Sequence, residues 1–231
     1  MNTMETSHAT SVKRRGRPLS FDRNEALDKA ILQFWKTGYE TTGVAALTKA
    51  MGITAPSLYT AFGDKESLFL ECVQRYTNPG PKSTPDRIRD APSAKDAARK
   101  LLEISARWFT QPKTPAGCLV AGASASGSDE ARVVRAALTK IRNDNQKALR
   151  KRAERDIREG RLPKTATPRA LAAMTTALVQ GMSTLAQDGA DQKQLLELVQ
   201  AAMAAWPDDP SQETLVGTQA PRLTRIRRIN R

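Results

Sequence analysis

The chain has 231 residues, of which 39% are hydrophobic and 26% charged, and this balance predicts one or two packed domains rather than a disordered polypeptide. Its 37 Lys and Arg outnumber its 24 Asp and Glu, leaving a formal charge of +13, which favours a polyanionic partner, either nucleic acid or a membrane surface. The sequence carries neither a signal pattern nor an apolar run approaching the roughly 20 residues that span a bilayer. We therefore expect a cytoplasmic protein without membrane association.

The residue types on which many enzymes depend are scarce. The single histidine, His8, lies in the polar leader MNTMETSHATS, and Cys72 and Cys118 belong to no CxxC or Cys/His cluster. This excludes Ser-His and Cys-His nucleophilic systems from the folded part and argues against a zinc site or a disulfide framework. No glycine-rich phosphate loop is present. We predict no enzymatic activity, no catalytic residues, no metal and no cofactor.

The first elements in the chain are two helices joined by a short connection. From Phe21 onward apolar residues recur at helical spacing, and the stretch ends at Gly38, a typical helix stop. Thr42 is the expected cap of a short second helix, and Gly52 is expected to form the turn after it.

The next stretch contains the start signals of two more helices. Thr54 is expected to cap a third helix with Pro56 in its first turn, and Asp64 to cap a fourth. Two short helices joined by a tight glycine turn, with a longer helix on each side, match the helix-turn-helix arrangement. The outward side chains of the third helix are mostly small and would let its backbone approach a major groove closely: Ala55, Ser57, Tyr59, Thr60 and Ala61.

A basic arm precedes these helices. In VKRRGRP, residues 12–18, Arg14, Arg15 and Arg17 surround a flexible glycine. Such an arm can lie in the narrow minor groove, where the negative potential is enhanced. Short basic runs are also commonly solvated tails, so the arm supports DNA binding only together with the helix-turn-helix.

Residues 17–76 resemble the N-terminal DNA-binding domain of the TetR family of bacterial transcriptional regulators. The resemblance is carried by RP before the first helix, FWKTGYETTGVAALTKAMGI and SLYTAFGDKESLF. It implies a homodimer whose two third helices enter successive major grooves of operator DNA. By position it implies that Tyr59 and Lys65 contact phosphates and that Thr42 contacts the DNA backbone at the start of the second helix. The residues that it implies face the major groove are Ala55, Pro56, Ser57 and Thr60, and Thr54 is also expected at the DNA. Thr48 stands where many members have alanine, so its hydroxyl must find a backbone acceptor.

The chain after residue 77 resembles that family only in its architecture. NPGPKSTPDRIRDAPS predicts a loop, Ser93 begins a helix, AGCLVAGASA predicts a short buried helix, and residues 129–159 predict a long helix. Between residues 132 and 164 there are twelve Lys or Arg against four Asp or Glu, a net charge of +8. We favour a solvated basic face, and the alternative is a second DNA footprint or the wall of an anionic effector's site.

Two apolar helices, expected over 168–187 and 191–206, complete the fold. Their apolar surface exceeds what packing within one subunit is expected to bury, and a two-fold interface of four helices would bury the remainder. The alternative is that all of these apolar residues belong to the core of a single subunit. The residues expected in this interface are Met174, Leu178, Gly181, Met182, Leu195, Val199 and Met203. The residues expected in an effector pocket are Trp108, Cys118 and Met174. Cys118 is either a buried core residue, which we favour, or a sensor of electrophiles.

The sequence thus predicts an all-α protein with four segments: a disordered basic arm (1–16), a helix-turn-helix domain (17–77), a helical effector-binding and dimerisation domain (78–207) and a basic disordered tail (208–231). The expected function is a homodimeric repressor that binds a palindromic operator in double-stranded DNA and is released by an unidentified small-molecule effector. The alternative is an architectural or nonspecific DNA-binding protein, which would bind all sequences with nearly uniform affinity.

Overall fold

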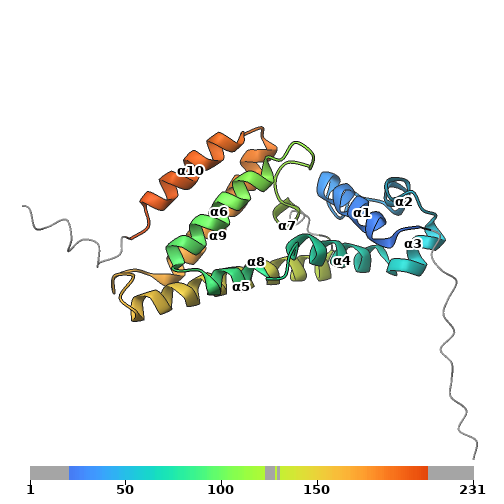
Figure 1. Ribbon diagram of the computed structural model, residues 1–231. Coiled ribbons are helices and arrows are strands. Elements are labelled where there is room, and N and C mark those ends of the chain that lie inside the picture. The colour runs from blue at the N-terminus through green and yellow to red at the C-terminus, as the bar shows by residue number, and fades with distance from the viewer. Residues whose placement is uncertain (1–20, 123–127, 129–130, 208–231) are drawn as a thin grey trace, which may run out of the picture.

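The computed structural model describes residues 21–122, 128 and 131–207. The segments expected as the basic arm, with Arg14, Arg15 and Arg17, and as the basic tail lie outside the described residues. The described part is built of α-helices (Figure 1), as the sequence predicts. These helices are α1 (Arg23–Thr37), α2 (Val44–Met51), α3 (Ala55–Phe62), α4 (Lys65–Thr77), α5 (Thr84–Asp90), α6 (Ala94–Phe109), α7 (Leu119–Gly122), α8 (Arg132–Arg158), α9 (Pro168–Gln187) and α10 (Gln192–Ala204).

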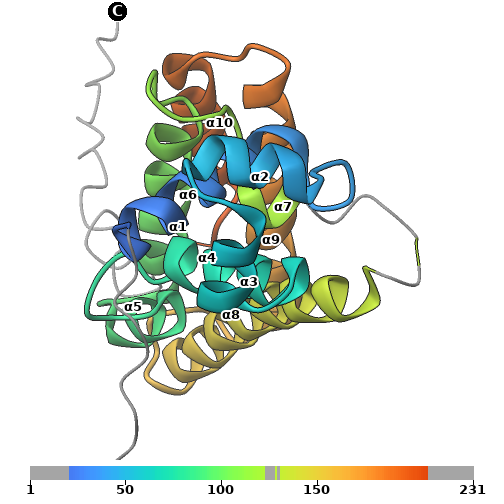
Figure 2. The same cartoon turned by 90° about the vertical axis from the view of Figure 1, so that its right-hand side faces the viewer.

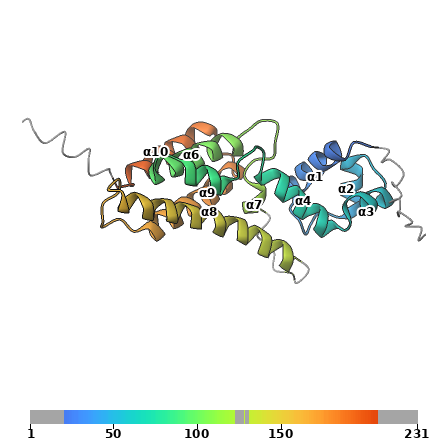
Figure 3. The same ribbon diagram turned by 60° about the horizontal axis from the view of Figure 1, so that its bottom comes forward.

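The helices form two groups along an elongated molecule. Helices α1 to α4 cluster at one end, and α6, α9 and α10 pack together at the other (Figure 1). Helix α8 runs along one side of the molecule, where it contacts α9, α6, α5 and α4 (Figure 3). The short helix α7 lies between the groups (Figure 1) and contacts α1, α4 and α9. Figure 2 shows the same helices along the long axis of the molecule, from the end that holds α1 to α4. Through α7 and α8 the two groups therefore share packed contacts.

The starts of α3 and α4 follow from their capping residues. The Thr54 hydroxyl accepts the amide N–H of Ser57 at 3.3 Å, and the Asp64 carboxylate accepts that of Ser67 at 2.7 Å. Both bonds satisfy amides that the first turn of a helix leaves without partners. These two predicted caps are confirmed.

The α1–α4 group is closed by polar contacts between its outer helices. Arg23 donates to both carboxylate oxygens of Glu71, at 2.5 and 2.7 Å, and to the carbonyl of Ala61 at 3.1 Å. Its guanidinium also lies 4.4 Å from the centroid of the Phe62 ring. One side chain at the start of α1 therefore holds the end of α3 and the middle of α4 in place.

The segment expected as a loop contains helix α5, so that prediction is wrong. Ser83 caps this helix through the amide of Asp86 at 3.3 Å, and Pro85 lies in its first turn. Seven residues are too few to show a clear helical period. Ile88, however, is buried in the hydrophobic core formed with α6, α8, α9 and α10, and α5 packs along α8. Tertiary contact thus stabilises a helix that its own sequence only weakly favours.

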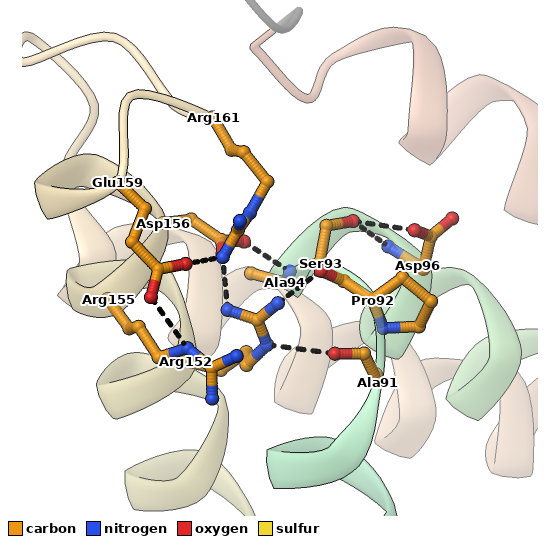
Figure 4. Close-up of polar contacts among 10 residues, drawn as sticks. All are labelled: Ala91, Pro92, Ser93, Ala94, Asp96, Arg152, Arg155, Asp156, Glu159 and Arg161. Carbon is orange, nitrogen blue, oxygen red and sulfur yellow. Dashed lines mark hydrogen bonds and ion pairs between the residues drawn. The ribbon is translucent and has the colours of Figure 1, made fainter.

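Helix α8 carries a buried ion pair where a fully solvated basic face was expected. The side chains of Arg152 and Asp156 are 1% and 0% exposed and bond to each other (Figure 4). Arg152 also donates to the carbonyls of Ala91, at 3.1 Å, and Pro92, while Asp156 accepts the amide of Ala94 at 2.5 Å. The pair therefore anchors the start of α6 to α8, and the solvated-face prediction is wrong for these two residues.

Within the described residues, no helix is long and apolar enough to cross a membrane. The same residues include no group of three or more His, Cys, Asp or Glu side chains arranged to hold a metal ion.

Candidate functional site

The connection between α2 and α3 is a tight turn centred on Gly52. Gly52 has φ of 72° and ψ of 31°, in the left-handed region where glycine is strongly favoured. Its amide and that of Ile53 both donate to the carbonyl of Thr48, at 2.9 and 3.1 Å. The Thr48 hydroxyl donates to the carbonyl of Ala45 at 3.1 Å, which confirms that it finds a backbone acceptor.

Helix α3 buries one face and exposes the other, as a recognition helix must. Leu58 and Phe62 are buried in the core, as predicted. Tyr59 is 52% exposed, and no hydrogen bond to its phenol is found among the described residues. The remaining residues predicted to face DNA are exposed or half-buried and lie together at the start of this helix: Thr54, Ala55, Pro56, Ser57 and Thr60.

Local hydrogen bonds restrict the hydroxyl groups on this surface. The Thr60 hydroxyl donates to the carbonyl of Pro56 at 2.8 Å, and the Thr54 and Ser57 hydroxyls lie 2.9 Å apart. A hydroxyl oxygen that donates one bond can still accept another. This surface can therefore form single hydrogen bonds with base edges and place methyl groups against thymine.

Lys65 begins α4 beside the exposed end of α3. Its ammonium donates to the carbonyl of Tyr39 at 3.2 Å and lies 4.5 Å from the centroid of the Tyr39 ring. These contacts hold the ammonium against the α1–α2 connection and leave N–H donors of the ammonium for an anion. The role of Tyr39 in positioning Lys65 was not predicted, because it depends on two residues 26 positions apart.

The structure corrects the two roles predicted for Thr42. Its side chain is buried at 1% exposure, and its hydroxyl bonds to the carbonyl of Gly38 and the hydroxyl of Thr37. Helix α2 begins after Gly43 without a side-chain cap. The Thr42 hydroxyl closes the α1–α2 connection and is not available to a DNA phosphate.

We expect Lys65→Ala to weaken binding to specific and unrelated DNA by a similar factor, because we predict that its ammonium neutralises a phosphate and does not read a base. The slope of log affinity against log salt should fall by about one per subunit. Fluorescence anisotropy at several salt concentrations measures both effects. Lys100→Ala, an exposed lysine on α6, is the matched control and should change neither; a loss confined to one DNA sequence would contradict the phosphate role.

A cavity of about 480 Å³ lies in the second helical group. Its wall is mainly apolar and includes residues of α4, α5, α6, α7, α8 and α9, among them Tyr76, Ile104, Trp108, Val120, Ile141 and Val179. Trp108 and Cys118 line it, as the effector-pocket prediction requires. Met174 does not line it and packs instead against the hydrophobic core formed by α6, α8, α9 and α10, so that part of the prediction is wrong.

Gly117 lets the chain before α7 press against α9 at the edge of this cavity. It has φ of 81°, and a Cβ atom there would lie 2.8 Å from the carbonyl oxygen of Ser183. The amide of the next residue, Cys118, donates to the Ser183 hydroxyl at 2.9 Å. This close approach determines where the Cys118 thiol meets the cavity.

The Cys118 thiol is a poor nucleophile in this environment. Burial raises its pKa, and the Tyr76 hydroxyl, 3.7 Å from the sulfur, only partly opposes this shift. A raised pKa leaves less thiolate at neutral pH than an ordinary cysteine has. The environment favours the core interpretation of Cys118 over the sensing one.

We expect Cys118 in the native protein to resist iodoacetamide at pH 7 and to react readily once the chain is unfolded. Mass analysis of the peptide around residue 118 gives the extent of reaction, with Cys72 as an internal control because burial also raises its pKa. Fast native labelling of Cys118 alone would support electrophile sensing.

An aromatic cluster connects the cavity wall with the α1–α4 group. The Trp35 ring of α1 stacks on the Trp108 ring of α6, with centroids 6.4 Å apart and an interplanar angle of 12°. The Tyr76 ring of α4 meets both edge-on, at 5.0 Å from Trp35 and 6.3 Å from Trp108. Because Tyr76 and Trp108 also line the cavity, a bound molecule would touch two of the three rings.

The predicted interface residues divide into two groups. Met182, Leu195, Val199 and Met203 are buried in the core of the single chain, so the prediction is wrong for these four. Their faces of α9 and α10 pack against the rest of the same subunit. Met174 and Leu178 are half-buried, and Gly181 is exposed.

The exposed side of α9 is instead formed by small and apolar residues at helical spacing: Ala173, Ala177, Gly181 and Leu185. Leu185 is 44% exposed, and a Cβ atom added at Gly181 would meet nothing within 4 Å. A second helix could therefore approach α9 closely along this line.

A glycine turn between the short helices α2 and α3, an exposed face on α3 and a lysine at the start of α4 define a helix-turn-helix DNA-binding protein. Residues 26–72 match the family described as "Bacterial regulatory proteins, tetR family", and residues 94–205 match "Tetracyclin repressor-like, C-terminal domain". The chain belongs to the TetR family of bacterial regulatory proteins. This membership confirms the sequence-based resemblance and, because the family consists of regulators, the expectation that the chain is not an enzyme.

Individual relatives extend this similarity over nearly the whole chain. The HTH-type transcriptional repressor ComR of Escherichia coli is 31% identical over 207 residues, covering 89% of this chain and 99% of ComR. BdcR, a repressor of the same organism, is 33% identical over 105 residues, covering 46% of this chain and 53% of BdcR. A cysteine mutant of the TetR family regulator CifR, solved with 26-bp double-strand operator DNA, is 38% identical with a TM-score of 0.77, covering 83% of this chain and 100% of that one.

Proposed function

We propose that this protein is a transcriptional repressor that binds a palindromic operator as a homodimer and leaves it when a small molecule fills the cavity. The observation that carries the proposal is the exposed recognition surface of α3, started by Thr54 and flanked by Lys65. The names of ComR and BdcR as repressors, and the operator DNA in the CifR structure, support the same function for this chain. Its place of action is the cytoplasm, where the operator is found.

The DNA interface consists of the α3 surface, Tyr59 and Lys65, together with the basic arm expected before residue 17. The α3 residues Thr54, Ala55, Pro56, Ser57 and Thr60 read the major groove, while Tyr59 and Lys65 hold phosphates. Thr42 is no longer part of this set, because its hydroxyl is buried. In a homodimer, two such surfaces bind half-sites one helical turn apart, which requires an operator with two-fold symmetry.

Release follows from a shift between two arrangements of the subunits. An effector lowers operator occupancy only if it binds more tightly to the arrangement whose α3 helices do not match successive major grooves. The rings of Trp35, Tyr76 and Trp108 offer a direct physical connection, since a change at the cavity wall moves groups packed on α1 and α4. We therefore assign the cavity as the effector site.

Selection of bound fragments from a random DNA library tests this function. We expect recovery of one inverted-repeat sequence, bound about 10³-fold or more above random DNA. Nearly uniform recovery would instead support an architectural or nonspecific DNA-binding protein.

The same selection with Ser57→Ala tests the recognition surface. If Ser57 contacts a base edge, its loss changes the preference at one symmetric pair of positions and leaves the salt dependence of binding nearly unchanged. An unaltered sequence preference would mean that Ser57 does not contribute to sequence-specific recognition of the bases. Ser67→Ala, an exposed serine on α4, is the matched control and should retain the original profile.

A further inference from the structure

The wall of the cavity carries more positive than negative side chains. Three charged side chains lie along it: Arg87 of α5, and Arg142 and Asp144 of α8. The Asp144 carboxylate accepts a hydrogen bond from Lys140, at 2.6 Å, and Lys140 is not part of the wall. The acidic group is therefore neutralised from outside, and the two arginines leave the wall positive.

Arg142 is half-buried, and within the described residues its guanidinium forms hydrogen bonds only with neutral oxygens. Its guanidinium donates to the carbonyl of Val120 at 3.1 Å and to the hydroxyl of Thr139 at 3.0 Å. No Asp or Glu of the described residues forms an ion pair with Arg142 or Arg87. A guanidinium has five N–H donors, so donors of Arg142 remain available.

The Arg142 charge reaches the Cys118 thiol, another group of the cavity wall. Burial raises the pKa of the Cys118 thiol, and the charge of Arg142 opposes that shift. Both side chains also lie in the wall, among the apolar groups of Trp108, Val120 and Ile141. A positive group in such surroundings attracts an anion more strongly than the same group in water.

We propose that the effector is a small molecule with an apolar body and one carboxylate group, and that Arg142 binds the carboxylate. This inference rests on the proposed role of the cavity as the effector site. The apolar wall explains why an inorganic anion alone would bind poorly, since it would leave that wall unfilled. A carboxylate supplies the charged acceptor that Arg142 lacks among the described residues, in the planar geometry that a guanidinium prefers.

The position of Arg142 also connects this ligand to the DNA-binding end. Its bond to Val120 ties α8 to α7, and α7 contacts α1 and α4. A carboxylate that binds the remaining donors of Arg142 would lie beside the contact that ties α8 to α7. Binding at Arg142 would therefore act next to the packing of α7 against the DNA-binding helices.

Isothermal titration of the full-length protein with 4-phenylbutyrate and its neutral analogue 4-phenylbutyramide tests the assignment. We expect the acid to bind about tenfold or more tightly than the amide, because hydrogen bonds to charged groups are stronger than neutral ones. Arg142→Met should remove this preference and leave amide binding unchanged. Arg142→Lys keeps the charge and should retain part of the preference, and Lys147→Met, an exposed site on the same helix, should retain all of it.

Equal binding of acid and amide, a preference that survives Arg142→Met, or failure of both probes to bind would overturn the acidic class of ligand. Failure of the proposed function is recognised separately, in the DNA selection without any ligand. A neutral apolar compound that binds the cavity and releases a selected operator would overturn the carboxylate assignment and leave the proposed repressor function intact.

Discussion

Replacing Asp156 by asparagine should lower the free energy of unfolding by about 3–5 kcal/mol, the usual cost of leaving a buried charge without its partner. Arg152 would keep its positive charge at 1% side-chain exposure with only the carbonyls of Ala91 and Pro92 as acceptors. The new amide group would also present N–H donors to a site where Arg152 and the Ala94 amide already donate. Urea denaturation followed by circular dichroism measures the change.

The matched control for this prediction is Glu154→Gln, on the same helix. Glu154 pairs with Arg150 at 3.4 Å, but both side chains are more than two-fifths exposed. Exposed pairs of this kind contribute about 0–1 kcal/mol, so the control should unfold almost like the wild type. If the two variants lost the same stability, the buried network would not be what anchors α6 to α8.

Ala177→Arg should produce a folded monomer and lower operator affinity by about 10²–10⁴-fold, because the second half-site then no longer binds as part of one molecule. Ala177 lies on the exposed side of α9 between Ala173 and Gly181, where small side chains would allow a partner helix to approach. A long charged side chain there prevents close packing and places an unpaired charge in the contact. Sedimentation velocity gives the oligomeric state, and anisotropy gives the affinity.

The same substitution at an exposed alanine of α8, Ala136→Arg, controls for the added charge. It should leave the protein dimeric with operator affinity close to that of the wild type. A dimeric Ala177→Arg protein with normal affinity would mean that the subunits meet through another surface. Circular dichroism of both variants separates loss of the dimer from loss of the fold.

The exposed face of α9 shows why the interface could be predicted only in part. Apolar residues recur along α9 and α10, but the period alone does not say which of them face the same subunit and which face a partner. Met182 and Leu195 are buried because α6 packs on both α9 and α10, and this packing depends on residues far apart in the chain. Gly181 was among the residues expected in the interface, but only the packing distinguishes it, as an exposed residue, from the buried Met182 and Leu195.

The sequence by itself determined the features that depend on neighbouring residues. Thr54 and Asp64 satisfy amides within three positions, and Gly52 adopts a backbone conformation that other residues rarely take. These local effects were sufficient to locate α3 and to predict its buried and exposed faces. They were also sufficient, with the resemblance of residues 17–76, to identify the family.

Only the tertiary structure decided which polar groups are buried. Thr42 and Arg152 belong to residue types that are common at helix starts and on solvated faces, yet both are buried. Arg152 takes its carbonyl acceptors from Ala91 and Pro92, 61 and 60 positions earlier in the chain. The cavity beside Arg142 is likewise formed where six helices meet, α4 to α9. The physical reason is that burial and pairing of a polar group depend on segments distant in sequence, whereas capping and turn formation depend on the few residues next to it.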